Sequence, residues 1–248
     1  MSSELTNTYE SFNQVLCDLQ NLNQSIEKIR KRIEIEIKVP YASQDARQIA
    51  LDGFQCDISV CGWWIKVLMA LRGLSKERFG DNWDKEYQKL IGTGLPYLQT
   101  EDLMLDYLRN TITAKVCFKI ENLFSNILKQ LSANPKKDGF WNISDAMLRE
   151  AGISTIGKER NILTALANLR NSFHANGIHR KDPLSVEIDG IRFEFSKGKR
   201  VECASWKHIV VIMCAAISVL ASILFSTKVS NLRGEIPDDF AASLTTAD

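Results

Sequence analysis

An arginine, an amide and a histidine lie within five residues of one another in the run Leu-Arg-Asn-Ser-Phe-His-Ala-Asn-Gly-Ile-His at 169–179. The run is predicted to end a helix, where residues four apart share a face. Arg170 and His174 would therefore project side by side, with Asn171 on the adjacent flank. A permanent cation beside a group that titrates near neutrality can bind a phosphate and move a proton. Gly177 is expected to end the helix by adopting a positive φ.

These residues also have a structural interpretation. Arg170 could pair with a carboxylate, and His174 could be a partly buried histidine whose hydrogen bonds are satisfied. His179 lies beyond Gly177 and is expected in a surface loop. It could instead be the second histidine of a site whose residues are spaced less strictly. The residue types therefore permit phosphate chemistry at this helix end without requiring it.

No other catalytic or metal-binding pattern stands out. Phosphate-loop, nucleophile-elbow and paired-histidine zinc motifs are absent, and six scattered cysteines accompany only three histidines. We therefore expect neither a metal nor a cofactor. The net charge of +1 gives no overall basic field, which disfavours DNA binding but not action on a short RNA stretch. Because the N-terminus lacks a signal-peptide pattern, a reduced, cytoplasmic protein is expected.

The chain has 248 residues, 45% hydrophobic and 25% charged, which suits a globular protein with a core. Residues 1–40 are predicted to form one long helix that Pro40 ends. Its apolar residues largely alternate steps of three and four, the spacing of a coiled-coil seam. They are Leu5, Phe12, Val15, Leu19, Leu22, Ile26, Ile29 and Ile33. The seam could pack along its own domain or mediate self-association.

Residues 41–232 are predicted to form the main helical domain, and 233–248 a disordered tail. Helices are expected over 44–74, 100–131, 144–151, from 157 through the Arg–His segment, and from 205, with a loop containing one short helix over 75–98.

Two segments with period-two alternation flank Asp189-Gly190, at 184–188 and 191–195, which predicts a β-hairpin. Residues 196–201 could add a third short strand. The fold class is therefore mainly α, a bundle of about five helices with a small β-hairpin inserted before the last helix.

The last predicted helix allows two interpretations. Residues 209–227 carry no charge and are long enough to span a bilayer, so membrane association is one alternative. Ala215, Ser218, Ala221 and Ser222 give the same segment small residues suited to close packing inside a bundle. A helix that is hydrophobic all round can be either a core element or a membrane span.

The Arg-Asn-x-x-His run and the order of elements over about 44–230 resemble the HEPN superfamily, all-helical domains that include metal-independent ribonucleases. Three residues separate Arg170 from His174, where the nuclease pattern has four to six. The shorter spacing turns the histidine by about 100° around the helix.

The resemblance implies that RNA is the substrate, because its 2′-hydroxyl supplies the nucleophile. Arg170, Asn171 and His174 would be catalytic, and Arg170, His179 and Arg180 would contact RNA. It also implies a homodimer whose Arg170/His174 faces together build one cleft. Three hypotheses stay open: an endoribonuclease of the toxin–antitoxin or antiviral defence type, a catalytically silent module that binds RNA or a protein partner such as an antitoxin, and a membrane-associated helical protein.

Overall fold

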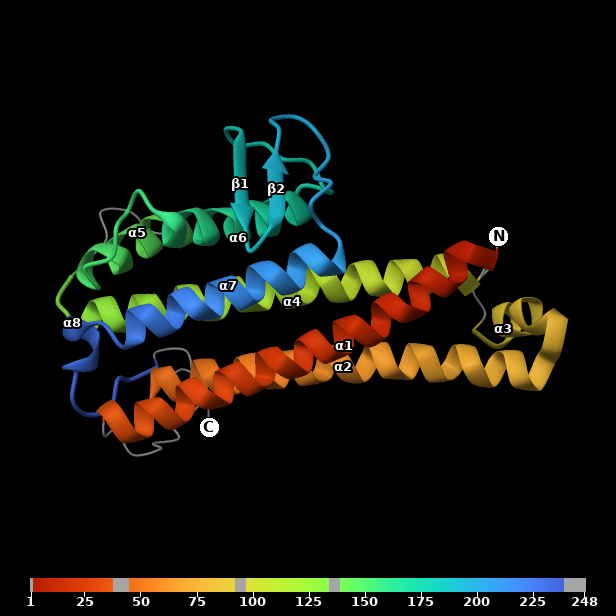
Figure 1. Cartoon of the computed structure of the whole chain (residues 1–248), viewed down its shortest axis with the longest axis horizontal. Helices are drawn as coiled ribbons and strands as arrows, with labels where there is room; N and C mark the ends of the chain where they lie inside the picture. The colour runs from red at the N-terminus through yellow and green to blue at the C-terminus, as the bar shows by residue number, and fades with distance from the viewer. Residues whose placement is uncertain (1, 38–44, 92–96, 134–138, 239–248) are drawn as a thin grey trace, which may run out of the picture.

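The computed structural model describes residues 2–37, 45–91, 97–133 and 139–238 (Figure 1). Its helices are α1 (Ser2–Arg32), a π-helical turn η1 (Ile33–Ile37), α2 (Ala46–Phe79), a 3-10 turn η2 (Gly80–Asn82), α3 (Trp83–Ile91), α4 (Tyr97–Gln130), α5 (Phe140–Glu150), α6 (Lys158–His174), α7 (Trp206–Leu224) and α8 (Thr227–Ser230). The strands β1 (Leu184–Ile188) and β2 (Ile191–Phe195) form a hairpin before α7. The predicted mainly α fold with a hairpin inserted before the last long helix is confirmed.

The long helices pack side by side. α1 lies against α2 and α7, and α4 lies against α2, α6 and α7 (Figure 1). α5 and α6 form the outer part of the bundle next to α4, and the hairpin stands on α6 and α7. α7 is buried along most of its length and contacts α1, α4 and α6, so it is a central element of the bundle.

The seam on α1 is covered by its own chain. Side chains from Phe12 to Ile33 that follow the three–four spacing are buried, and the helix contacts α2 and α7. This outcome matches packing along the same domain for the described part of the segment, residues 2–37. The side chain of Leu5 and the predicted stop at Pro40 lie outside the described parts of the chain.

The second long helix ends later than the sequence predicted. α2 continues past Leu74 to Phe79, because no proline interrupts it before Gly80 adopts a positive φ of 53°. The segment expected to be mostly loop after 75 therefore contains the end of α2 and all of α3.

The predicted hairpin is confirmed with the predicted strand bounds, and its register places Leu184 opposite Phe195 and Ile188 opposite Ile191. Asp189 and Gly190 both have positive φ, 48° and 76°, as a tight two-residue turn requires. The predicted third strand over 196–201 is wrong. That segment turns at Gly198 and instead bonds to residues 177–179 through backbone groups.

Residues 233–238 also differ from the predicted disordered tail. The fully buried pair Asp45–Arg47 holds this segment: Arg47 donates hydrogen bonds to the carbonyls of Leu232 (3.3 Å) and Gly234 (2.8 Å), and Asp45 accepts one from the Ile236 amide (3.0 Å). The tail thus docks on the start of α2. Residues 239–248 lie outside the described part of the chain.

Candidate functional site

α6 carries the predicted site residues at its C-terminal end. The helix ends at His174, and Asn176 and Gly177 then adopt positive φ of 54° and 81°. The Gly177 amide donates back to the Ser172 carbonyl at 2.7 Å, which closes the helix end. The predicted helix and its termination near Gly177 are therefore confirmed.

Arg170 is held from several sides. Its Nε and Nη2 atoms each donate to Asn171 Oδ1 at 3.3 Å, and its Nη1 atom lies 3.3 Å from Glu121 Oε2 on α4. The guanidinium is also 5.7 Å from the centre of the Phe140 ring at the start of α5. Arg170 therefore has the carboxylate partner of the structural interpretation, while its bonds to Asn171 join the first two residues of the motif.

His174 lies one turn beyond Arg170 and its side chain is exposed. Within the described residues the structure gives its ring no hydrogen bond or ion pair. Because residues four apart share a flank of a helix, the imidazole sits on the Arg170 side of α6. The structure thus brings Arg170 and Asn171 into direct contact and leaves His174 next to them, open to solvent.

A cleft of about 580 Å³ begins beside this motif. Its walls are the start of α5 (139–142), the face of α6 from Arg160 to Asn171, and the loop 181–184. This volume lies within the range of small-molecule sites. Arg170 and Asn171 line the cleft, whereas His174 is not among its lining residues.

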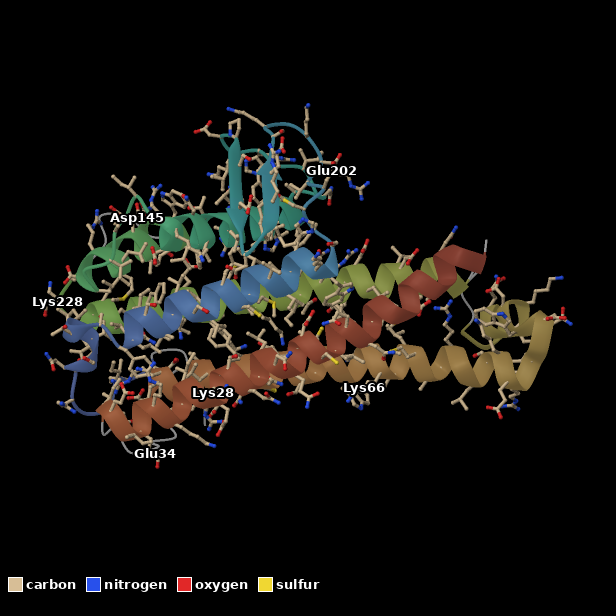
Figure 2. All side chains as sticks on the ribbon, in the orientation of Figure 1. Lys28, Glu34, Lys66, Asp145, Glu202 and Lys228 are labelled. Atoms are coloured by element: carbon tan, nitrogen blue, oxygen red, sulfur yellow. The ribbon has the colours of Figure 1, made fainter. Side chains whose placement is uncertain are left out.

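The cleft combines aromatic, cationic and amide groups. Trp141 is 38% exposed, and the Arg160 guanidinium lies 4.5 Å from its ring centre. Arg160 Nε also donates to Asp145 of α5 at 3.1 Å. Asp145 is labelled beside α5 in Figure 2. A base can stack on an exposed indole, and arginine side chains suit phosphates. Such a lining fits a nucleotide better than an apolar ligand.

Most residues that line this cleft were not predicted from the sequence. One pattern could have indicated them: Arg160, Thr164 and Asn171 recur at steps of four and seven and so mark one polar face of a helix. Trp141 and Lys181 come from separate segments that precede and follow that helix. Only the packing of α5 and the 181–184 loop against α6 brings them together.

His179 is not in an exposed loop, so that expectation is wrong. Its side chain is 1% exposed, its Nε2 atom lies 3.0 Å from the Asp182 carbonyl oxygen, and its ring packs 5.3 Å from that of Phe195. A ring buried in this way does not face RNA. It instead fixes the loop that carries Lys181, while Arg180 is exposed.

Two helices are long and apolar enough to cross a membrane by length and composition alone, over residues 46–86 and Trp206–Leu224. Most of the apolar window of α7 is buried in the bundle, whereas only a third of that in residues 46–86 is. Core helices of soluble proteins pass the same test. Among the described residues, no group of three or more histidine, cysteine, aspartate or glutamate side chains is arranged to hold a metal ion.

No protein-family model, curated protein or solved structure matches the chain. Functional inference therefore depends on the chemistry of the residues at the end of α6 and in the adjoining cleft.

Proposed function

We propose that this chain is a HEPN-like protein that binds single-stranded RNA in the α5–α6 cleft and cuts it without a metal at the end of α6. The observation that carries the proposal is the joined pair Arg170–Asn171, which lines the nucleotide-sized cleft one helical turn from an exposed histidine. The aromatic and cationic lining supports RNA as the ligand.

The reaction would use groups of the RNA and of α6 only. The 2′-hydroxyl oxygen attacks the adjacent phosphorus and the bond from phosphorus to the 5′-oxygen breaks, leaving a 2′,3′-cyclic phosphate and a 5′-hydroxyl. His174 would accept the proton of the 2′-hydroxyl or donate one to the departing 5′-oxygen. Arg170 would stabilise the extra negative charge on the phosphoryl oxygens, and Asn171 would keep the guanidinium in place.

A catalytically silent RNA-binding module is the second candidate. Two observations support this candidate: Glu121 already partners Arg170, and His174 stands outside the cleft lining. In this case RNA would bind through Trp141, Arg160 and Arg170 and leave unchanged. A protein partner such as an antitoxin could then control access to the cleft.

An RNA assay with EDTA present distinguishes the two candidates. We expect the wild type to cut a labelled single-stranded RNA, and His174→Ala to lower the rate by roughly 10²- to 10⁴-fold while RNA affinity and melting temperature stay unchanged. The control is Arg192→Ala, which removes an exposed arginine from the hairpin and should leave cleavage intact.

Trp141→Ala tests the cleft itself. It should weaken RNA binding by about 1–3 kcal/mol if a base stacks on the indole. Binding that Trp141→Ala weakens, without cleavage by the wild type between about pH 5 and 9, would establish the silent module instead of the nuclease. Absence of both binding and cleavage in the folded wild type would refute both candidates.

A further inference from the structure

α6 contributes three asparagines to the cleft, and Asn168 is the most buried of them. The polar residues on this flank of the helix follow one another at steps of three, four and three, and they are Asn161, Thr164, Asn168 and Asn171. Asn168 is 8% exposed, whereas Asn161 and Asn171 are half-buried. Asn168 therefore places an amide deep in the cleft, where a bound ligand would exclude water from it.

The side-chain amide of Asn168 has no hydrogen-bond partner among the described residues. Ser172 Oγ donates to the backbone carbonyl of Asn168 at 2.7 Å, but the side chain keeps an unused acceptor and two unused donors. These amide atoms stay accessible from the cleft, whereas the unpartnered amide atoms of Gln48 and Asn126 are enclosed by protein. The folded chain thus holds a nearly buried amide whose hydrogen bonds must come from water or from a ligand in the cleft.

The other polar groups on this flank of α6 are engaged or more exposed. Thr164 Oγ1 donates to the Arg160 carbonyl at 2.7 Å. Asn171 Oδ1 accepts two bonds from Arg170, both at 3.3 Å. Asn161 lies closer to solvent, where water can satisfy its amide. Asn168 is therefore the group on this flank that gains most from a hydrogen-bonding ligand.

We propose that Asn168 reads adenine, which makes it the specificity-determining residue of the RNA binding proposed above, on which this inference rests. A side-chain amide presents an acceptor beside a donor. Adenine matches this pair through N6 and N7 and also through N6 and N1, because an unpaired base exposes both of these edges. Adenine is thus the base that can satisfy the Asn168 amide with either edge.

The other bases fit the amide less well. Guanine offers two acceptors, N7 and O6, on the edge where adenine offers a donor and an acceptor. Cytosine and uracil can pair with an amide only through their Watson–Crick edge. Because a buried polar group left unpaired is costly, a site of this kind rejects a base that leaves the Asn168 amide without partners.

The position of Asn168 along α6 also places the base relative to the phosphate. Asn171, which bonds to the Arg170 guanidinium, follows Asn168 by three residues, a rise of about 4.5 Å along the helix axis. A phosphate bound at Arg170 would therefore be next to the adenine at Asn168. In a wild type that cleaves RNA, the cuts should map to the phosphate next to an adenine, and cuts spread evenly over the sequence would contradict the proposal.

Labelled oligouridylates that carry a single central adenine, cytosine or guanine test the base preference. Fluorescence anisotropy with the full chain should show about tenfold tighter binding of the adenine probe than of the unsubstituted oligouridylate. Trp141→Ala should weaken binding of all probes by a similar factor, because stacking on an aromatic ring tolerates every base. The ratio of affinities thus reports on Asn168, and the absolute affinity reports on Trp141.

Two substitutions at Asn168 separate base reading from a structural role. Asn168→Leu should lose the preference and keep the melting temperature, because no described group of the protein depends on the amide. Asn168→Asp keeps the shape but presents two acceptors, so the preference should move from adenine to guanine, whose N1 and N2 atoms donate side by side. A side chain that only supports the fold would not exchange one base for another.

Asn110→Leu is the matched control. Asn110 is an exposed asparagine on α4 outside the cleft, so the same substitution there should change neither the affinity nor the preference. An equal loss of preference in Asn110→Leu and Asn168→Leu would overturn the assignment, because the effect would then not come from the cleft.

Failure of this inference can be told apart from failure of the RNA proposal. Equal affinities for all probes, or a preference for another base, in a wild type whose binding depends on Trp141 would overturn the reading of adenine alone. A preference that survives in Asn168→Leu would do the same. Adenosine and uridine 5′-monophosphates, measured by calorimetry, cover the case of a wild type that binds no RNA. Binding of the adenosine monophosphate that requires Asn168 would then support the adenine site, and binding of neither nucleotide would refute both proposals.

Discussion

Arg170 illustrates how one residue can serve both structure and function. Its guanidinium is shared between Asn171, which belongs to the motif, and Glu121, which belongs to α4. A phosphate entering the cleft would compete with the carboxylate for the same Nη1 atom. Glu121 thus lowers the availability of the cation on which the proposed RNA contact depends.

Replacing this carboxylate should strengthen RNA binding. Glu121→Gln removes the competing charge, and we expect affinity for single-stranded RNA to rise by about three- to tenfold at low salt, with a smaller gain at high salt. Filter binding or fluorescence anisotropy measures the change. Glu187→Gln alters the net charge equally at an exposed hairpin position, and an equal gain there would mean that Glu121 acts only through overall charge.

His208 is expected to make the stability of the protein depend on pH. Burial lowers the pKa of His208 below its ordinary value of 6.5, and the ring lies 2.7 Å from Ser205 Oγ and 5.3 Å from the Phe193 ring. The unfolded chain therefore binds a proton at this ring more readily than the folded protein. Stability linked to His208 is fully present above pH 6.5 and is lost as the pH falls through the lower, folded-state pKa.

The expected result is a fall in melting temperature from pH 7 to pH 5 that is steeper for the wild type than for His208→Gln. Thermal denaturation followed by circular dichroism at several pH values measures both slopes. Because other groups titrate equally in the two proteins, the difference between the slopes isolates this ring. Identical slopes would show that the histidine has the same pKa in both states.

At the scale of elements, the β-hairpin depends on its two-residue turn. Gly190 has a φ of 76°, and a Cβ atom added there would meet nothing within 4 Å. Gly190→Ala should therefore destabilise the protein by about 1–2 kcal/mol through backbone strain alone.

Gly73 supplies a matched control for this change. It also has open space around its Cβ position, but it lies inside α2 with a helical φ. The same substitution at Gly73 should stabilise by about 0.5–1 kcal/mol. Chemical denaturation measures both, and equal effects at the two positions would contradict an origin in the positive φ.

In the molecule as a whole, the Asp45–Arg47 pair joins the start of α2 to the last described segment of the chain. Both side chains are fully buried, with Arg47 Nη2 at 2.7 Å from Asp45 Oδ2, and both also bond to backbone groups between Leu232 and Ile236. The pair therefore fixes the start of α2 and the C-terminal segment at once.

Removing the arginine should destabilise the whole bundle. Arg47→Met leaves a buried carboxylate without its cation, and we expect a loss of about 3–5 kcal/mol in the free energy of unfolding. Arg192 pairs with Glu194 on the exposed surface of the hairpin, so Arg192→Met should change stability by about 0.5 kcal/mol or less. Urea denaturation compares the two, and a similar small effect at both positions would show that Arg47 does not hold the tail.

Elements with local signals could be predicted from the sequence alone. The alternation around Asp189-Gly190 specified a hairpin, the three–four spacing specified α1, and Gly177 marked the end of α6. Each signal acts over a few residues through backbone conformation or side-chain periodicity. The chemistry of the Arg170–His174 segment was also readable, because helical geometry alone places these two side chains on one flank.

Which surfaces meet could not be predicted from local signals, because it depends on how the elements pack. The burial of His179 and the cleft between Trp141 and Arg160 depend on how neighbouring elements pack, and the docking of residues 233–238 depends on contacts with residues about 190 positions earlier in the chain. The apolar seam of α1 is buried because α2 and α7 pack against it. Periodicity specifies that a helix has an apolar face, but the packing of the other helices determines whether that face is covered.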